Sequence, residues 1–353
     1  MPAVLDRYLA DLEERIDPAE EERLHAEWHA FAAGRFPGAL FTPQRTQKVP
    51  PRVEWPEVLV NDTLADYERM ALQQFRMCSQ ALAAGTGNLF SVRCNYGTSI
   101  LPSLFDVDLF VMDRASNTLP TSWPLRGGAD AIRALVDRGA PDITAGLGAR
   151  TLAMGRRFVE WMEPYPKIRR YVHVYHPDLQ GPMDVAEVVW GSPIFLELVD
   201  HPDLVKAFLQ LITDTYVRFI EEWRLLVPQE FAGDCSVHWG FLFRGHVMLR
   251  DDSAMNLSPA MFAEFVEPYD RQLLEQYGGA IHFCGRGDHY ADRFPALQGL
   301  GAINLSQPEL NDMEAIFRNS VDQGIAILDL ARQAAEDALA RGRALHGRVH
   351  CRP

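Results

Sequence analysis

Apolar side chains recur every three or four residues in several stretches of the chain, which is the spacing of an amphipathic helix. Two long helices are predicted at 64–82 and 202–223. One face of the second carries Val205, Phe208, Ile212, Tyr216, Phe219 and Trp223. Asp17 and Ser258, each followed by a proline, are N-cap residues that predict two further helix starts. We expect Pro268 to kink the helix that begins at Ser258.

Short apolar runs beyond residue 87 predict β-strands. The predicted strands are 90–96, 104–112, 171–176, 246–250, 280–284, 302–305, 325–328 and 348–351. From residue 279 onward the strands alternate with predicted helices at 288–297, 312–321 and 331–343. This alternation favours a parallel sheet, either closed as a (β/α)8 barrel or open as a doubly wound sheet.

Composition narrows the class of protein. The 353 residues, of which 47% are apolar, can bury the core of one elaborated barrel, although the length also fits two domains. A net charge of −14 without any Lys/Arg run argues against a nucleic-acid partner or an anionic membrane surface. No apolar stretch approaches the roughly 18–20 residues of a membrane span, and residues 1–33 are charged throughout, so we expect a cytoplasmic protein.

The cysteines are odd in number and widely spread: Cys78, Cys94, Cys235, Cys284 and Cys351. Such a set is a poor disulfide framework in a reducing compartment. Free thiols or metal ligands are the better interpretation.

His282 and Cys284 carry the clearest candidate chemistry. They stand in the segment G-A-I-H-F-C-G, and alternate side chains of a strand share a face. If the sheet closes into a barrel, the strand ends meet at one mouth, so Cys351 at the end of the last predicted strand can approach them. The bland alternatives are a buried cysteine beside a hydrogen-bonded histidine, and a terminal Cys351 without a role. We favour a zinc site formed by these three residues.

Two thiolates and one imidazole leave a fourth zinc position for a substrate, as in open catalytic sites. Two thiolates also nearly neutralise the ion, so a bound thiol can lose its proton and still remain nucleophilic. The predicted site therefore suits alkyl transfer to a thiol better than hydrolysis.

The segment D-D-S-A-M-N-L-S-P (251–259), the helix with F-x-x-F-V-x-P-Y (262–269) and the I-H-F-C-G strand resemble the uroporphyrinogen decarboxylase superfamily. D-L-Q-G-P-M-D (178–184) resembles another of its segments. The resemblance implies a (β/α)8 TIM barrel over residues 89–353, with residues 1–88 as an N-terminal helical extension packed on it in one structural domain.

Within this superfamily, H-x-C followed later by a cysteine is similar to the zinc pattern of methylcobamide:coenzyme M methyltransferases. The resemblance implies His282, Cys284 and Cys351 as zinc ligands. It also implies a methyl donor, a corrinoid such as methylcobalamin on a partner protein, and a small-molecule thiol as acceptor. A homodimer is left open as a further assembly.

Two other functions stay open. A metal-free decarboxylase of a tetrapyrrole or another carboxylated substrate is the first, although the segment V-R-C-N-Y-G-T (92–98) has one arginine where decarboxylases of the superfamily have an M-R-Q-A-G-R-like sequence. A non-catalytic barrel that binds a corrinoid or a tetrapyrrole is the second.

Several polar residues near strand ends are further candidates. Asp251 and Asp252 are catalytic candidates, as a fourth metal ligand or a proton acceptor, and at most one should point inward because neighbours on a strand face opposite ways. The substrate-binding candidates, each of which has a purely structural alternative, are Asn95, Tyr96, Gln180, His238, His246 and Gln307. The sequence H-A-E-W-H (25–29) lacks the glutamate position of a metalloprotease helix, so we reject that function for it.

Overall fold

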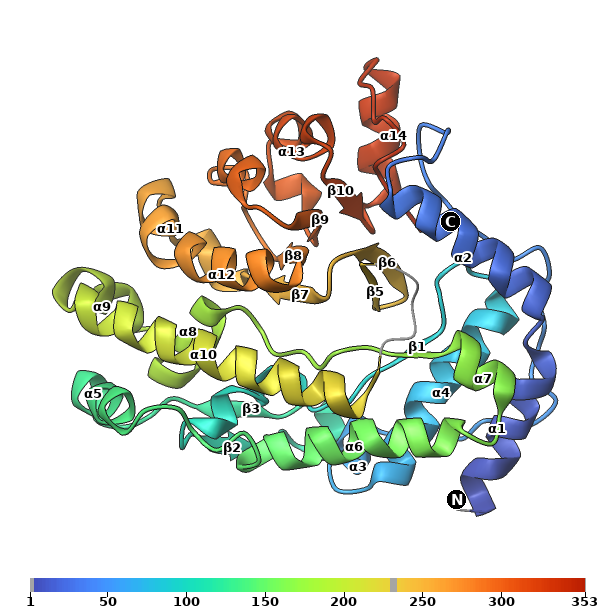
Figure 1. The fold of residues 1–353 in the computed structure, drawn as a ribbon, viewed down its shortest axis with the longest axis horizontal. Coiled ribbons are helices and arrows are strands. Elements are labelled where there is room, and N and C mark those ends of the chain that lie inside the picture. Colours follow the sequence, from blue (N-terminus) through green and yellow to red (C-terminus); the bar gives the residue numbers. More distant parts are fainter. Residues whose placement is uncertain (1–2, 229–233, 353) are drawn as a thin grey trace.

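The computed structural model describes residues 3–228 and 234–352. Figure 1 shows short strands at the centre of a mixed α/β structure, with helices around them. The helices before residue 228 are α1 (Ala3–Arg15), α2 (Pro18–Ala32), α3 (Val60–Thr63), α4 (Tyr67–Ala84), α5 (Gly128–Arg138), α6 (Gly146–Met162), α7 (Pro166–Tyr171), α8 (Pro182–Trp190), α9 (Ile194–Asp200) and α10 (Pro202–Leu226). The later helices are α11 (Pro259–Phe265), α12 (Glu267–Tyr277), α13 (Met313–Asn319) and α14 (Arg332–Ala340).

A parallel sheet forms the C-terminal half of the structure. Its strands, in spatial order, are β10 (Ala326–Leu328), β9 (Leu300–Leu305), β8 (Gly279–Phe283) and β7 (Val247–Arg250). Paired residues of neighbouring strands share a face, so the register sorts the side chains into rows. One row consists of Met248, Ala280, Ala302 and Ala326, and the next row toward the strand ends consists of Arg250, His282, Asn304 and Leu328.

The row of alanines makes room for a β-hairpin that the sequence did not reveal. Strands β5 (Cys235–His238) and β6 (Phe241–Arg244) pair antiparallel, and β6 contacts β8, β9 and α2. Both turn residues, Trp239 and Gly240, have positive φ, as a two-residue type I′ turn requires. The hairpin therefore fills the space over the small side chains, and its turn carries Trp239 toward the ends of the strands.

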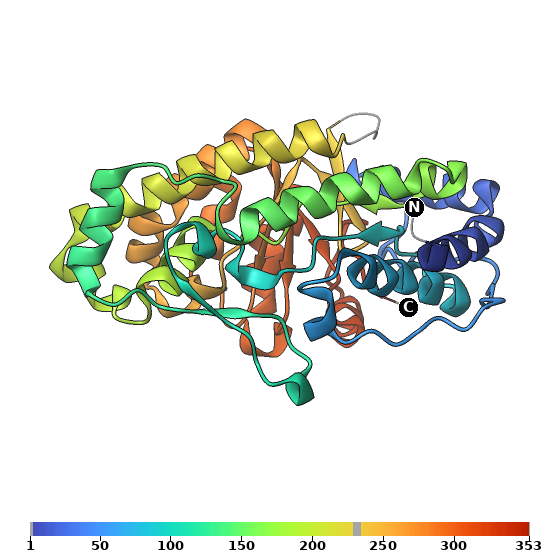
Figure 2. The same ribbon diagram turned by 90° about the horizontal axis from the view of Figure 1, so that it is seen from below.

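Most of the predicted strands are confirmed: β9 is longer than expected, β8 has the expected length, and the others are shorter. Strands β1 (Ser91–Val92), β4 (His173–Val174), β7, β8, β9 and β10 all fall within or across predicted ones. The prediction for 104–112 is confirmed only for β2 (Asp108–Phe110), which follows the 3-10 segment Pro102–Leu104. This strand pairs antiparallel with β3 (Thr121–Trp123) and lies outside the parallel sheet. Figure 2 shows that the loop joining β2 and β3 extends away from the body of the molecule.

Further hydrogen bonds place more parallel segments beside the sheet. Gly181 N–H donates to Arg250 O (2.8 Å), which brings the chain after β4 to β7. On the other side, Val349 pairs with Ile327, and His350 pairs with Phe41. These contacts give a mixed α/β fold with a parallel sheet; over residues 3–228 and 234–352, no sheet pairs eight strands in a continuous ring.

The helices largely follow the predictions. Asp17, Ser258 and Asp312 cap α2, α11 and α13 through their side chains. The expected kink at Pro268 is a complete break, because α11 ends before Val266 and α12 begins with Pro268 in its first turn. The helix predicted at 288–297 is a 3-10 segment, Ala291–Ala296, with a proline inside it. Within the described part of the chain, no helix is long and apolar enough to cross a membrane.

A buried ion pair fixes the N-terminal helices to the rest. Arg45 makes two hydrogen bonds to the Glu21 carboxylate on α2 (2.8 and 2.7 Å), and both side chains are 1% exposed. Arg45 also donates to Asn88 O (3.1 Å) and lies 4.0 Å from the centre of the Phe90 ring. The pair therefore joins α2 to the segment that enters β1.

We predict that Glu21→Ala lowers the free energy of unfolding by about 3–5 kcal/mol, because Arg45 is then left charged and buried without its partner. Denaturant unfolding followed by circular dichroism measures the change. Glu14→Ala is the matched control, since Glu14 pairs with Arg52 at the surface, where the two side chains are 63% and 70% exposed. Equal losses in the two variants would contradict the structural role of the buried pair.

Candidate metal centre

Strand β8 positions two of the predicted ligands. His282 lies in the inward row between Arg250 and Asn304, and Cys284 follows the last strand residue, Phe283. The side chains share a face, and Cys284 Sγ lies 3.4 Å from His282 Nε2. The two-residue spacing thus brings the two side chains together, as alternation along a strand predicts.

Asp252 is the third donor. It begins the 3-10 segment Asp252–Asn256 after β7, and its Oδ1 lies 3.5 Å from His282 Nε2. The same oxygen accepts a hydrogen bond from Cys284 N–H (2.7 Å). Asp184 on α8 fixes this segment, because its carboxylate accepts the N–H groups of Asp252 (3.0 Å) and Ser253 (2.7 Å).

The three donor atoms fit one small metal ion. His282, Cys284 and Asp252 each offer a ligand atom, and these atoms all lie within 4.8 Å of one another. Zinc bonds of about 2.0–2.3 Å at tetrahedral angles separate neighbouring ligand atoms by about 3.3–3.6 Å. The 3.4 Å S–N and 3.5 Å N–O separations match this spacing.

The hydrogen bonds of His282 select the tautomer that a metal needs. Its Nδ1 lies 2.6 Å from Asn304 Oδ1, while Asn304 Nδ2 donates to Leu328 O (2.7 Å). Because the amide nitrogen is committed to that carbonyl, Asn304 Oδ1 accepts the proton of Nδ1 and leaves the Nε2 lone pair toward Asp252 and Cys284. Burial also lowers the pKa of His282, which favours the neutral ring.

The thiol of Cys284 lies 3.4 Å from Ser306 Oγ on the neighbouring strand end. Burial raises the pKa of this thiol above its ordinary value. Without a metal the group is therefore a thiol at neutral pH, and a bound cation would be needed to hold it as a thiolate.

An aromatic side chain, Trp239, and a cationic one, Arg250, lie beside the donor atoms. The Trp239 ring meets the His282 ring edge-on at 5.2 Å, and the Arg250 guanidinium lies 4.6 Å from the centre of the indole. Arg250 and Arg93 both pair with buried Asp178. Although burial opposes ionisation of this carboxyl, the two guanidinium groups hold its pKa far below the usual range. Small-ligand sites are typically cavities of about 300–1,000 Å³.

One such cavity, of about 490 Å³, reaches this group. Its lining includes the side chains of Arg93, Tyr175, Trp239 and Arg352. A ligand in this cavity would therefore meet two guanidinium groups and two aromatic rings. Among these residues, the sequence analysis considered only Arg93, as the single arginine of the segment 92–98.

Cys351 lies outside the group of three donor atoms. Its N–H donates to Phe41 O (3.0 Å), and its side chain is fully buried. Burial raises the pKa of the thiol to about 12, and its charged neighbours are Arg332, Asp329 and Glu336. Asp252, which the sequence analysis named as a fourth ligand, thus stands in the donor group where Cys351 was expected.

Asp251 faces the other way from Asp252. Asp251 is 1% exposed, and its carboxyl lies beside that of buried Asp270 of α12. Burial raises the pKa of Asp251 well above its usual range and that of Asp270 to about 7, so this pair holds a proton rather than two charges.

The six substrate-binding candidates separate into groups. Asn95 and Tyr96 are buried after β1, and buried Gln180 adopts a left-handed backbone conformation (φ +67°). His238 is buried, with its Nε2 3.5 Å from Asp178 Oδ1. Gln307 Oε1 accepts the Gly285 N–H (2.6 Å) and so holds the turn after β8.

His246 precedes β7, at the opposite end of the strand from Arg250, and bonds to Ser236 Oγ (3.0 Å). The donor cluster therefore draws on none of the six. Sequence reasoning missed Asn304, Asp178, Arg250, Trp239 and Asp184. A signal existed for Asn304, which stands one residue before the end of its strand, as His282 does. Asp178 and Asp184 were also marked, because they begin and end the segment D-L-Q-G-P-M-D.

Comparisons with known proteins support the fold. No protein-family model matches the chain, and no curated protein gives a significant match. Among solved structures, a methyltransferase from Methanosarcina mazei superposes with a TM-score of 0.61 at 12% sequence identity, covering 92% of each chain. At this identity, the likeness establishes a shared α/β fold over nearly the whole chain.

Proposed function

We propose that the protein is a zinc-dependent methyltransferase of the cytoplasm, which moves a methyl group from a corrinoid to a thiol. The observation that carries the proposal is the convergence of Asp252 Oδ1, His282 Nε2 and Cys284 Sγ. The motif resemblance to methylcobamide:coenzyme M methyltransferases supports it. So does the shared fold with a solved protein called a methyltransferase. We further propose a (β/α)8 barrel and a corrinoid carried by a partner protein.

The ligand set would be His282, Cys284 and Asp252, with the fourth position left for the substrate. Cys284 and Asp252 each bring one negative charge and His282 brings none, so the set offsets the charge of Zn²⁺ as two thiolates would. When bound, zinc would lower the pKa of a substrate thiol and keep its sulfur nucleophilic. Asn304 holds the His282 ring, and Asp184 holds the Asp252 segment.

The cavity beside Trp239 supports a small acidic thiol as the methyl acceptor. Arg93 and Arg352 line it, and Arg250 lies between the indole and Asp178. Arg93 and Arg250 pair with Asp178, and Arg352 pairs with Asp329, so three guanidinium groups meet two carboxylates. The remaining positive charge would stabilise an added negative charge.

A decarboxylase remains the second candidate, and the same arginines favour it. Arg93 and Arg250 approach one buried point, which a substrate carboxylate could reach by competing with Asp178. This reaction needs no metal, so the metal content of the protein separates the two functions.

We predict about one zinc per chain in the purified protein, measured by elemental analysis. His282→Ala, Cys284→Ser and Asp252→Asn should each lose most of it, because each removes a donor atom. Cys351→Ser is the matched variant and should keep the metal. If Cys351→Ser loses the zinc while Asp252→Asn keeps it, the ligand set proposed from the sequence replaces the one proposed here.

Removal of the hydrogen bond to His282 Nδ1 should weaken zinc binding without removing a ligand. We expect Asn304→Ala to lower zinc affinity by about 10–100-fold in chelator competition, because the imidazole loses its fixed tautomer and orientation. Ser306→Ala is the control, since its contact is with a thiol at 3.4 Å, and it should change the affinity much less. An unchanged affinity in Asn304→Ala would show that the ring is positioned by other contacts.

Methyl transfer is tested directly by the absorbance change of methylcobalamin on demethylation. We expect the zinc-loaded protein to accelerate this change with an acidic thiol, and the Cys284→Ser protein to lose at least about 100-fold of the rate. Methylcobalamin that stays unchanged with every thiol tested, despite bound zinc, would contradict the proposed reaction.

A further inference from the structure

The turn of the β5–β6 hairpin holds a residue that this kind of turn does not favour. Trp239 takes the first of the two turn positions with φ +52°, where type I′ turns prefer Asn, Asp or Gly. A bulky side chain at positive φ is strained, because its Cβ lies close to the following carbonyl oxygen. Such strain persists where surrounding contacts demand the side chain, as they do at ligand sites. The strain at Trp239 therefore points to a role of the indole beyond closing the turn.

The indole contacts a cation and a proposed metal ligand at the same time. The guanidinium carbon of Arg250 lies 4.6 Å from the centre of the indole, and the His282 ring meets the indole edge-on at 5.2 Å. Arg250 and His282 are register partners on β7 and β8, so one side chain spans two neighbouring strand ends. The guanidinium also bonds to Asp178 Oδ1 (2.5 Å). Indole and carboxylate together hold this guanidinium beside the donor atoms.

Trp239 also lines the cavity of about 490 Å³. None of the three donor residues, all of which lie in the described part of the chain, lines this cavity. Because the indole touches both the cavity and His282, it stands at the boundary between the cavity and the donor atoms. A ligand whose acid group is held in the cavity must therefore pass the indole to bring a thiol to the donors.

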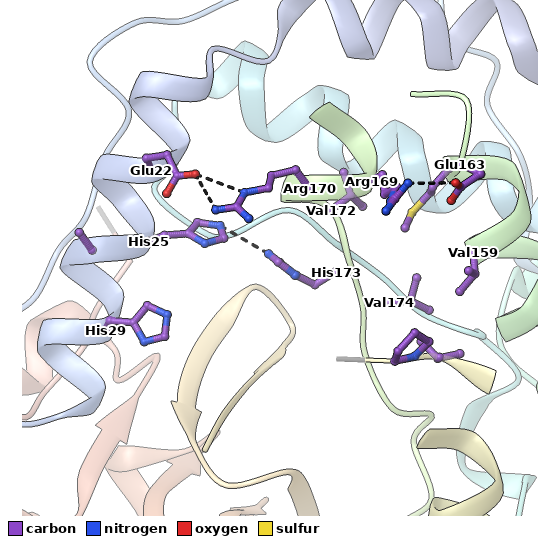
Figure 3. Close-up of a pocket in the computed structure, with 14 residues that line it drawn as sticks. Glu22, His25, His29, Val159, Glu163, Arg169, Arg170, Val172, His173 and Val174 are labelled. Carbon is purple, nitrogen blue, oxygen red and sulfur yellow. Dashed lines mark hydrogen bonds and ion pairs between the residues drawn. The ribbon is translucent and has the colours of Figure 1, made fainter. Parts of the chain in front are cut away.

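The charges of this cavity differ from those of the other large cavity. Figure 3 shows that second cavity, of about 520 Å³, which lies between α2, α6, α7 and β4. Arg170 pairs there with Glu22 (3.0 Å), and both line the cavity. Arg169 pairs likewise with Glu163 (2.9 Å). These charges balance one another, whereas three guanidinium groups meet two carboxylates beside Trp239.

We propose that Trp239 determines which acceptors reach the donor atoms. Its indole fixes Arg250 as the partner of the acceptor's acid group, and it excludes acceptors with a bulky link between the acid and the thiol. That the ligand is an acidic thiol rests on the proposed function. The cation–π contact sets the direction of the guanidinium. The ring cannot move aside without losing its contacts with Arg250 and His282, so it admits a short aliphatic link and blocks a wide one.

The test compares two acidic thiols that differ only in the group between the acid and the sulfur. One is 3-mercaptopropionate, with a short aliphatic link, and the other is 4-(mercaptomethyl)benzoate, with an aromatic ring. Calorimetry on the full-length, zinc-loaded protein should show at least about 10-fold tighter binding of 3-mercaptopropionate. Trp239→Ala should weaken its binding by about 10-fold, the size of one cation–π contact, and should strengthen binding of the benzoate. The preference is then lost or reversed.

Two more substitutions separate the indole from the turn. Trp239→Asn suits the backbone of a type I′ turn but lacks the ring, so it should behave as Trp239→Ala does. Trp239→Phe keeps an aromatic face and should retain most of the affinity for 3-mercaptopropionate. Val237→Ala is the structural control, because Val237 is a buried residue of the same hairpin. It should lower the melting temperature and leave the preference unchanged.

The same titrations on the metal-free protein keep the result apart from the fate of the zinc proposal. Without zinc, Trp239→Ala and Trp239→Asn should still weaken binding of 3-mercaptopropionate by about 10-fold, because the Arg250 contact involves no metal. A protein that binds no zinc would contradict the proposed function and leave this comparison intact. The inference is overturned if both variants keep the wild-type affinity in the metal-free protein, or keep the wild-type preference in the zinc-loaded protein.

Discussion

The register of β7, β8 and β9 is the constraint on which the rest of the site depends. It sets Arg250, His282 and Asn304 side by side on the inward face, and a shift of one residue would turn all three to the other face. The hydrogen bond from His282 to Asn304 spans two of these strands. This hydrogen bond fixes the imidazole tautomer that carries its proton on Nδ1. That tautomer leaves Nε2 available to a metal.

The row beneath explains why the site lies at the strand ends. Ala280, Ala302 and Ala326 leave space that the β5–β6 hairpin fills, and Val237, Phe241 and Leu242 of the hairpin belong to the same apolar cluster as these alanines. The turn of the hairpin then sets Trp239 against His282 and under Arg250. An apolar plug therefore closes one side of the donor cluster, while the strand ends leave the other side to solvent and substrate.

Local patterns predicted local geometry well. Alternation along β8 placed His282 and Cys284 together, and capping residues marked the starts of α2, α11 and α13. Predictions from local sequence patterns failed where a segment is placed by contacts with residues distant in the sequence. Residues 104–112 are apolar enough for a buried strand, yet Leu109 and Val111 are 40% and 53% exposed on a peripheral hairpin. The choice between Asp252 and Cys351 as a donor likewise depends on how loops pack, which no spacing encodes.

X-ray absorption at the zinc edge of the isolated protein tests the central assignment most directly, because sulfur and lighter donors scatter differently. The account predicts one sulfur at about 2.3 Å and nitrogen or oxygen donors at about 2.0–2.2 Å. A shell with two sulfurs would mean that a second cysteine binds in place of Asp252. A shell without sulfur would contradict the assignment of Cys284 and, with it, the proposed chemistry.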